Sequence, residues 1–204
     1  MTTLPQLESF LKTWWGDEFP ESSDSDSAFP APLSDFVRIA STFSSEIPEY
    51  RQRFEVPPKS WIEFNDDPWE VSPPQVEHGW VIADFDHEIP IPVWCTDQLE
   101  LTVLRPGGDQ WTAMGCDFDE FAIGFLLNQL HRNWKIRLSD SYKPASDVEP
   151  FFEVSSDFSR WIGGAFYFSE GLLWRADGSY VCANTIEVAS QYDQNWFHPE
   201  QRVT

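Results

Sequence analysis

The chain is poor in basic residues and in cysteine. Its 204 residues include 13 Lys and Arg against 34 Asp and Glu, which gives a formal net charge of -21. A surface this acidic repels nucleic acid and anionic membranes, so we predict neither as a partner. The three cysteines, Cys95, Cys116 and Cys182, are far apart and lack a C-x-x-C spacing, which argues against a disulfide framework and against a zinc site.

Long apolar runs are also absent from the sequence. No stretch approaches the ~18 uncharged apolar residues that a membrane-spanning helix needs. Residues 1–16 lack the basic region and the apolar region that together make a secretory signal. We therefore expect a cytoplasmic protein.

Aromatic residues, by contrast, are abundant. The chain has 11 Trp and 17 Phe, and 41% of its residues are hydrophobic. Disordered acidic segments lack such residues, so we predict a folded domain with a sizeable core and an unusually negative surface. Such a surface attracts basic proteins and accelerates their association, although the same charge also fits a role in solubility alone.

Two segments near the N-terminus have the apolar spacing of helices. Residues 4–15 show this pattern and are followed by Gly16, a residue type that commonly ends a helix. The pattern returns in residues 32–44. Between the two, residues 19–32 are polar and acidic and contain prolines near both ends. We expect a flexible loop there, because such a segment buries little apolar surface.

A third helix is predicted from Asp117 onward. Asp117 and Glu120 have the spacing of a capping box, in which each side chain accepts a hydrogen bond from a free amide at the helix start. Apolar residues then continue at helical spacing to about His131, and we expect them on one face of the helix. That face is expected to pack on a sheet.

Short runs of β-branched and aromatic residues between turn residues indicate strands. We expect an antiparallel meander from the runs at residues 61–64, 80–85, 89–94, 101–104 and 110–114. The run at 89–94 contains Pro90 and Pro92, which cannot donate to a strand ladder, so it is expected at a sheet edge or as an irregular strand. Further along, Asp177 and Gly178 separate two alternating runs and predict a hairpin with a type I′ turn.

The order of these elements predicts an α+β fold with N-terminal helices, an antiparallel meander with a packing helix, and further C-terminal β-hairpins. We expect three segments along the chain. Residues 1–28 form a helix and a flexible acidic loop, residues 29–131 form an α+β core, and residues 132–204 form a β-rich extension packed on that core.

One cluster of residues resembles a metal site. Asp84, Asp86 and His87 lie at the end of a predicted strand, and such side chains bind Mg²⁺, Mn²⁺ or a transition metal. A metal-dependent enzyme is therefore one alternative, although a solvated turn explains the same residues. The sequence has no Gly-x-Ser-x-Gly motif and no phosphate-binding loop, so we predict no catalytic residue, no metal ion and no cofactor.

Several stretches of the sequence match the pattern of a known family. Residues 29–40 combine a proline start with a helix and aromatic residues, residues 81–84 and 92–94 match central strands, and residues 117–130 match a closing helix that begins with a small polar residue, Phe and an acidic residue. In this order they resemble the SUKH superfamily, which includes a family of yeast cell-wall regulators and many bacterial toxin-immunity proteins. The resemblance implies an α+β domain without catalysis that binds a protein, often a polymorphic toxin and frequently a nuclease.

Charge and resemblance together predict a non-catalytic immunity protein that neutralises a basic cognate toxin. A nuclease toxin presents a cationic cleft for phosphates, toward which carboxylates steer and in which aromatic side chains are anchored. The candidate partner-binding residues provide both kinds of side chain and are Asp66, Asp67, Trp69, Glu70, Asp84, Asp86 and Glu88, with the acidic loop at 17–26 as a further candidate. The same electrostatics also fit an acidic DNA mimic that inhibits a nuclease or a defence protein.

Overall fold

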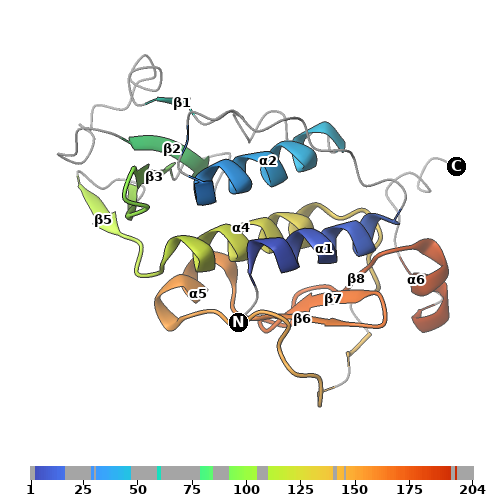
Figure 1. The fold of residues 1–204 in the computed structure, drawn as a ribbon. Helices are drawn as coiled ribbons and strands as arrows, with labels where there is room; N and C mark the ends of the chain where they lie inside the picture. Colours follow the sequence, from blue (N-terminus) through green and yellow to red (C-terminus); the bar gives the residue numbers. More distant parts are fainter. Residues whose placement is uncertain are drawn as a thin grey trace, which may run out of the picture. The chain divides into compact units, whose positions relative to one another are not determined.

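The computed structural model describes residues 3–16, 29, 31–46, 59–60, 79–84, 92–104, 110–139, 142–144, 146–193 and 196. These residues form five helices and two antiparallel sheets, which confirms the predicted α+β class (Figure 1). The chain divides into two compact units. Unit 1 comprises Met1–Glu18 and Ile123–Thr204, and unit 2 comprises Phe19–Ala122. The predicted division into three segments stays a prediction.

Unit 2 contains a five-stranded antiparallel sheet whose strands follow the order of the chain. They are β1 (Lys59–Ser60), β2 (Gly79–Asp84), β3 (Pro92–Thr96), β4 (Leu101–Leu104) and β5 (Trp111–Ala113). Each strand pairs with the next one along the chain, so the sheet is the predicted meander. Helix α2 (Ala31–Glu46) confirms the helix predicted at residues 32–44. The strand predicted at 61–64 and most of the loop predicted at 19–32 lie outside the described residues.

Strand β3 lies in the middle of this sheet, which corrects the edge position. The other expected alternative was an irregular strand, and the pairing of β3 with β2 is irregular, with a register shift between Val81 and Ala83. Strand β3 pairs with β2 on one side and with β4 on the other. Pro92 is its first residue, where a missing amide proton leaves the rest of the ladder intact. Val93, Trp94 and Cys95 follow and are almost completely buried, and burial of these apolar side chains favours a central strand over an edge strand.

Helix α4 (Phe118–Asn133) begins where the capping pattern predicts. The Asp117 carboxylate accepts a hydrogen bond of 2.8 Å from the Glu120 amide. The apolar side chains do not gather on one face as expected, because every residue from Phe121 to His131 is buried. A helix that is apolar around most of its circumference is typical of a buried core helix. The first five residues of α4 belong to unit 2 and the remainder to unit 1.

Unit 1 contains a three-stranded antiparallel sheet made of β6 (Phe166–Ser169), β7 (Leu172–Arg175) and β8 (Cys182–Ala183). Its helices, besides the larger part of α4, are α1 (Leu4–Trp15), α5 (Ser156–Ile162) and α6 (Ile186–Tyr192) (Figure 1). Helix α1 ends at Gly16 as predicted. The φ angle of this residue is 63°, a value that favours glycine.

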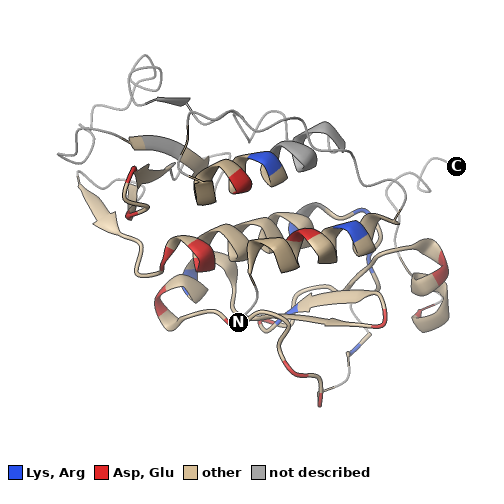
Figure 2. Ribbon diagram, in the orientation of Figure 1, with Lys and Arg blue, Asp and Glu red and all other residues tan. Residues whose placement is uncertain are grey.

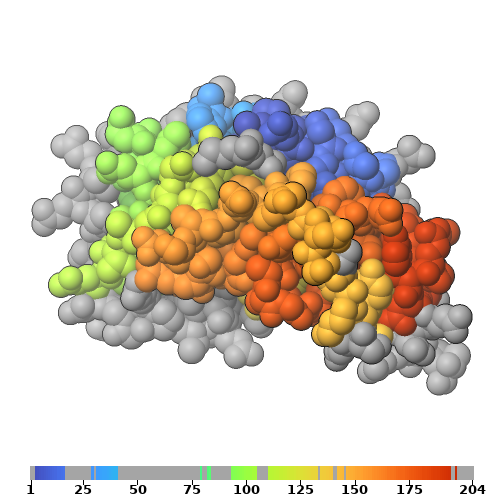
Figure 3. Space-filling view, turned by 90° about the horizontal axis from the view of Figure 1, so that it is seen from below, coloured from blue at the N-terminus to red at the C-terminus, as the bar shows by residue number. Residues whose placement is uncertain are grey.

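Both faces of the unit 1 sheet are covered. On one face, the Phe168 ring of β6 contacts the rings of Phe10 and Trp14 in α1, with centroids 4.9 Å and 6.1 Å apart. Because successive residues of a strand point to opposite faces, the neighbouring Tyr167 packs on the other side. That side holds an apolar cluster, which we call the sheet cluster: Ile136, Leu138, Leu172, Trp174, Val181, Ala183 and Ala189. In space-filling view, the orange and red segments of unit 1 form one continuous surface (Figure 3).

The turn with two positive φ angles lies between β6 and β7, not at the predicted Asp177 and Gly178. Glu170 and Gly171 connect those two strands, with φ angles of 51° and 82°. At the predicted position only Gly178 has a positive φ. The Asp177 carboxylate accepts a hydrogen bond from the Ser179 amide, and this local bond stabilises a different turn. Strands β7 and β8 are antiparallel neighbours all the same.

Replacing Gly124 by alanine tests how α4 packs within unit 1. A Cβ atom at this position would lie 2.7 Å from the Phe158 ring and 2.8 Å from the Ile162 side chain, both in α5. We expect Gly124→Ala to lower the free energy of unfolding by about 1–3 kcal/mol through overpacking. This expected net loss already includes the gain of about 1 kcal/mol that alanine brings to a helix. Urea denaturation followed by tryptophan fluorescence measures the difference.

A second substitution controls for the contact itself. Phe158→Leu removes the ring atoms nearest to the new Cβ, so Gly124→Ala should destabilise this background less than it destabilises the parent. Equal losses in the two backgrounds would show that the Phe158 ring is not what excludes a side chain at position 124.

Candidate functional site

Most of the predicted partner-binding residues lie outside the part of the chain that the structure describes. These are Asp66, Asp67, Trp69, Glu70, Asp86 and Glu88, and His87 of the alternative metal site lies there too. Asp84 is the last residue of β2, where it pairs with Pro92 of β3. The partner surface and the metal alternative therefore stay predictions.

The acidic residues that are described are spread over several elements (Figure 2). Several occupy the first turns of helices, where a negative charge interacts favourably with the helix dipole. Examples are Asp119 and Glu120 in α4, Asp157 in α5 and Glu187 in α6. These carboxylates therefore have a local structural role.

The two units differ strongly in charge. Residues 19–122 contain 21 Asp and Glu and 5 Lys and Arg, a formal net charge of -16. The residues of unit 1 contain the other 13 Asp and Glu and 8 Lys and Arg, a formal net charge of -5. Long-range attraction of a cationic partner is therefore expected to act mainly on unit 2.

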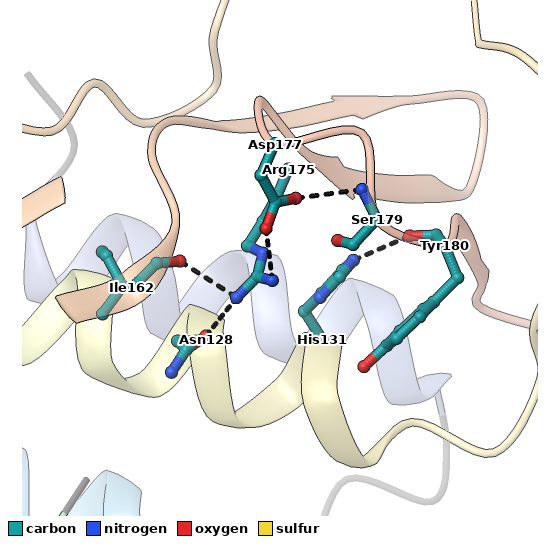
Figure 4. A network of polar contacts seen from close by, with 7 residues as sticks. All are labelled: Asn128, His131, Ile162, Arg175, Asp177, Ser179 and Tyr180. Atoms are coloured by element: carbon teal, nitrogen blue, oxygen red, sulfur yellow. Dashed lines mark hydrogen bonds and ion pairs between the residues drawn. The ribbon is translucent and has the colours of Figure 1, made fainter. Parts of the chain in front are cut away.

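The structure brings together a polar network in unit 1 that the sequence did not predict (Figure 4). The Arg175 guanidinium of β7 donates to the Asn128 side chain of α4 at 2.8 Å and to the Ile162 carbonyl of α5 at 3.0 Å. It also pairs with the Asp177 carboxylate at 2.6 Å. One side chain thus links two helices, a strand and the turn that follows the strand.

Asp177 is held in its ionised form by this network. Burial acts to raise its pKa, but hydrogen bonds from Ser179 and the positive charge of Arg175 outweigh burial, so the pKa of Asp177 lies below its ordinary value. The Ser179 amide donates to Oδ1 at 3.0 Å while Arg175 binds Oδ2. Both carboxylate oxygens are therefore engaged, which stabilises the turn.

His131, near the end of α4, forms the second part of the network. Its side chain is fully buried, and Nε2 lies 2.9 Å from the Tyr180 carbonyl oxygen. Because a carbonyl can only accept, Nε2 carries the proton, and Nδ1 has no hydrogen-bond partner among the described residues. The imidazole stacks on the Tyr180 ring, with centroids 4.6 Å apart and planes at 4°. Burial, together with the charge of Arg175, lowers the pKa of His131 to about 4.

Arg137 connects the network to the C-terminus of α4. Its guanidinium carbon lies 3.9 Å from the centroid of the Tyr180 ring. Its N–H groups donate to the Arg132 carbonyl at 2.6 Å and to the Trp134 carbonyl at 3.1 Å. A cation at this position satisfies carbonyl groups at the helix end and interacts favourably with the helix dipole.

The burial and protonation of the groups in and beside this network are those of structural side chains. The His131 imidazole is neutral at physiological pH and has no exposed surface. The Cys182 thiol donates to the His131 carbonyl at 3.4 Å, and burial raises its pKa to about 12. Burial likewise raises the pKa of Cys95 and Cys116 to about 12, so all three cysteines are protonated, poorly nucleophilic thiols at neutral pH.

The sequence did not predict this network because the residues that form it are far apart along the chain. His131 and Tyr180 are 49 positions apart, and Asn128 and Arg175 are 47 apart. The sequence signals were a basic residue at the end of the apolar run before Asp177, and polar residues, among them Asn128 and His131, within the apolar stretch of α4. Buried polar side chains need hydrogen-bond partners, so each of these residues pointed to a contact without naming the partner.

The described ranges contain neither a metal-binding cluster nor a membrane-spanning helix. No group of three or more His, Cys, Asp or Glu side chains in those ranges is placed to hold a metal ion. None of the helices described in Figure 1 is both long enough and apolar enough to cross a membrane.

Comparison of the chain with known proteins identifies no relative. The chain matches no family model, no curated protein and no solved structure at a significant level. The resemblance to the SUKH superfamily therefore stays a prediction.

The buried His131 predicts a loss of stability in acid. Its pKa is about 4 in the folded protein against an ordinary value of 6.5. The unfolded chain therefore binds more protons between these values, and stability decreases as the pH falls through this window. The contribution of His131 should be complete above pH 6.5 and should be smaller by about 3 kcal/mol at pH 4.

His131→Gln is the matched variant for this prediction. A glutamine amide can donate to the Tyr180 carbonyl as Nε2 does, but it does not titrate. Urea denaturation between pH 7 and pH 4 should show a smaller loss of stability in the variant than in the parent. The titration of Asp177 occurs below its ordinary range and is common to both proteins. Identical pH dependence in the two proteins would contradict the assignment of a buried, neutral His131.

Proposed function

We propose that the protein is a non-catalytic immunity protein that binds and neutralises a basic toxin domain made by the same cell. The observation that carries this proposal is the formal net charge of -21 on a folded chain with 11 Trp and 17 Phe. Residues 19–122, with a formal net charge of -16, include the seven named candidate residues between Asp66 and Glu88. A toxin of the nuclease type suits this charge, because its cleft is cationic in order to hold phosphates.

The carboxylates and Trp69 have different roles in this proposal. Asp66, Asp67 and Glu70 flank Trp69, and a second acidic group follows at residues 84–88. Carboxylates guide the approach of a basic partner over a long range, whereas an aromatic side chain contributes buried area once the complex has formed. Occupying the phosphate-binding cleft is sufficient for inhibition, so this chain needs no catalytic group.

The rate of association with the partner should depend strongly on salt. At physiological ionic strength the Debye length is about 8 Å, which weakens long-range steering. We expect the association rate constant to fall about tenfold or more between low and physiological salt. The measurement is stopped-flow mixing with the partner, which is first identified by affinity purification from the native host and mass spectrometry. Association that does not respond to salt would mean that the acidic surface serves solubility.

Substitutions at the candidate surface should separate the two roles. Neutralising Asp66, Asp67 and Glu70 together, to Asn, Asn and Gln, should lower the association rate constant. Trp69→Ala should mainly raise the dissociation rate constant, because it removes buried area from the complex. The same stopped-flow experiment measures both rate constants.

A matched triple variant controls for net charge. Asp147, Glu149 and Glu153 are exposed acids of unit 1, and neutralising them changes the net charge by the same amount. We expect this control to slow association less than the variant at residues 66, 67 and 70. Equal effects of both variants would mean that net charge, and not this surface, guides association. Normal association and normal protection of cells by both variants would contradict the proposed role of the acidic residues.

The identity of the purified partner separates this proposal from the DNA-mimic alternative. A toxin encoded beside the gene of this protein supports immunity. A host nuclease or defence protein that binds through its DNA site would instead support an acidic DNA mimic.

A further inference from the structure

A carboxylate and two tyrosine rings meet on the surface of unit 1. Glu170 lies in the turn between β6 and β7, and its Oε2 accepts a hydrogen bond from the Tyr192 hydroxyl of α6. The Tyr142 ring lies against the Tyr192 ring, with centroids 5.9 Å apart and planes at 74°. Both rings are half-buried and pack against the sheet cluster, which holds them in place. We call Tyr142, Glu170 and Tyr192 the Tyr-Glu site.

The backbone at Glu170 is unfavourable for this residue type. Its φ of 51° lies in the left-handed region, and a two-residue turn of this kind favours Asn, Asp or Gly at its first position. Backbone strain of this kind is often retained at functional sites. Asparagine would suit this turn better than glutamate. The turn conformation therefore does not account for a glutamate at position 170.

The electrostatics of the Tyr-Glu site favour a cation. The ion pairs of the described residues involve other acids, and the bond that Glu170 makes is with the neutral Tyr192 hydroxyl. This bond raises the pKa of Tyr192, while burial and then the charge of Glu170 raise the pKa of Tyr142. Both tyrosines are therefore neutral at physiological pH. The site presents one negative charge beside two aromatic rings, whose faces also attract cations.

We propose that the Tyr-Glu site binds an arginine side chain of a protein partner. A guanidinium is planar, stacks on tyrosine rings and pairs with carboxylates, so it matches both parts of the site. Arginine makes both kinds of contact within unit 1 itself. The guanidinium carbon of Arg137 lies 3.9 Å from the Tyr180 ring centroid, and a guanidinium nitrogen of Arg175 lies 2.6 Å from Oδ2 of Asp177. The site lies in unit 1, away in sequence from the acidic residues at 66–88, and the proposal does not depend on whether the partner is a toxin.

An NMR titration at low salt tests this proposal. The probe is a short glycine- and serine-based peptide with two arginines, and its control has citrulline at both positions, which keeps the shape and removes the charge. We expect the arginine peptide to shift the amide signals of residues 142, 170, 171 and 192, and the citrulline peptide to leave them unchanged. Equal shifts with both peptides, or shifts confined to residues 19–122, would overturn the proposal.

Two substitutions of Glu170 separate binding from folding. Glu170→Gln removes the charge and should weaken binding of the arginine peptide about fivefold or more. Glu170→Asn also removes the charge but suits the turn better, so the protein should be at least as stable as the parent while binding is weakened to the same degree. Glu153→Gln, which removes one exposed acid elsewhere in unit 1, should bind like the parent. Parent-like affinity in Glu170→Asn would overturn the proposal.

Discussion

The burial of helix α4 is the constraint on which the arrangement of unit 1 depends. Every residue from Phe121 to His131 is buried, although polar side chains lie among the apolar ones. A buried polar group without a partner costs about 1–3 kcal/mol, so the elements around the helix have to supply hydrogen bonds as well as apolar surface. Arg175 bonds to Asn128, and the Tyr180 carbonyl accepts from His131. These two contacts fix strand β7 and the segment after it against the helix.

The two faces of the unit 1 sheet have different roles as a result. One face packs against α1 through aromatic rings, and β7 and the segment after it hold the polar network with α4. The arginine, aspartate and histidine of this network make contacts within unit 1. The other face carries the sheet cluster, and this apolar layer supports the rings of Tyr142 and Tyr192 at the surface. The proposed Tyr-Glu site therefore lies where side chains pack on the core of unit 1 without being fully buried.

The two units also differ in the number and the surroundings of their acidic residues. In unit 1 some of the described acids stand in first turns of helices or in contact with arginine and tyrosine, others such as Glu153 are exposed, and the acidic excess is small. Residues 19–122 have 21 acidic residues against 5 basic ones. Such an excess is unfavourable for a compact state because like charges repel, and it is favourable for the capture of a cationic partner. We regard this asymmetry as the main physical support for a function in binding.

The sequence by itself determined the elements whose signals are local. The end of α1 at Gly16, the start of α4 at Asp117 and the meander all follow from backbone preferences and from bonds within a few residues. Tertiary structure decided the rest. Strand β3 is central because its apolar residues are buried there, and the turn at Asp177 differs from the expected one because its carboxylate is held by Ser179 and Arg175. The partners of Asn128 and His131 lie more than 40 positions away, and only packing brings such groups within hydrogen-bonding distance.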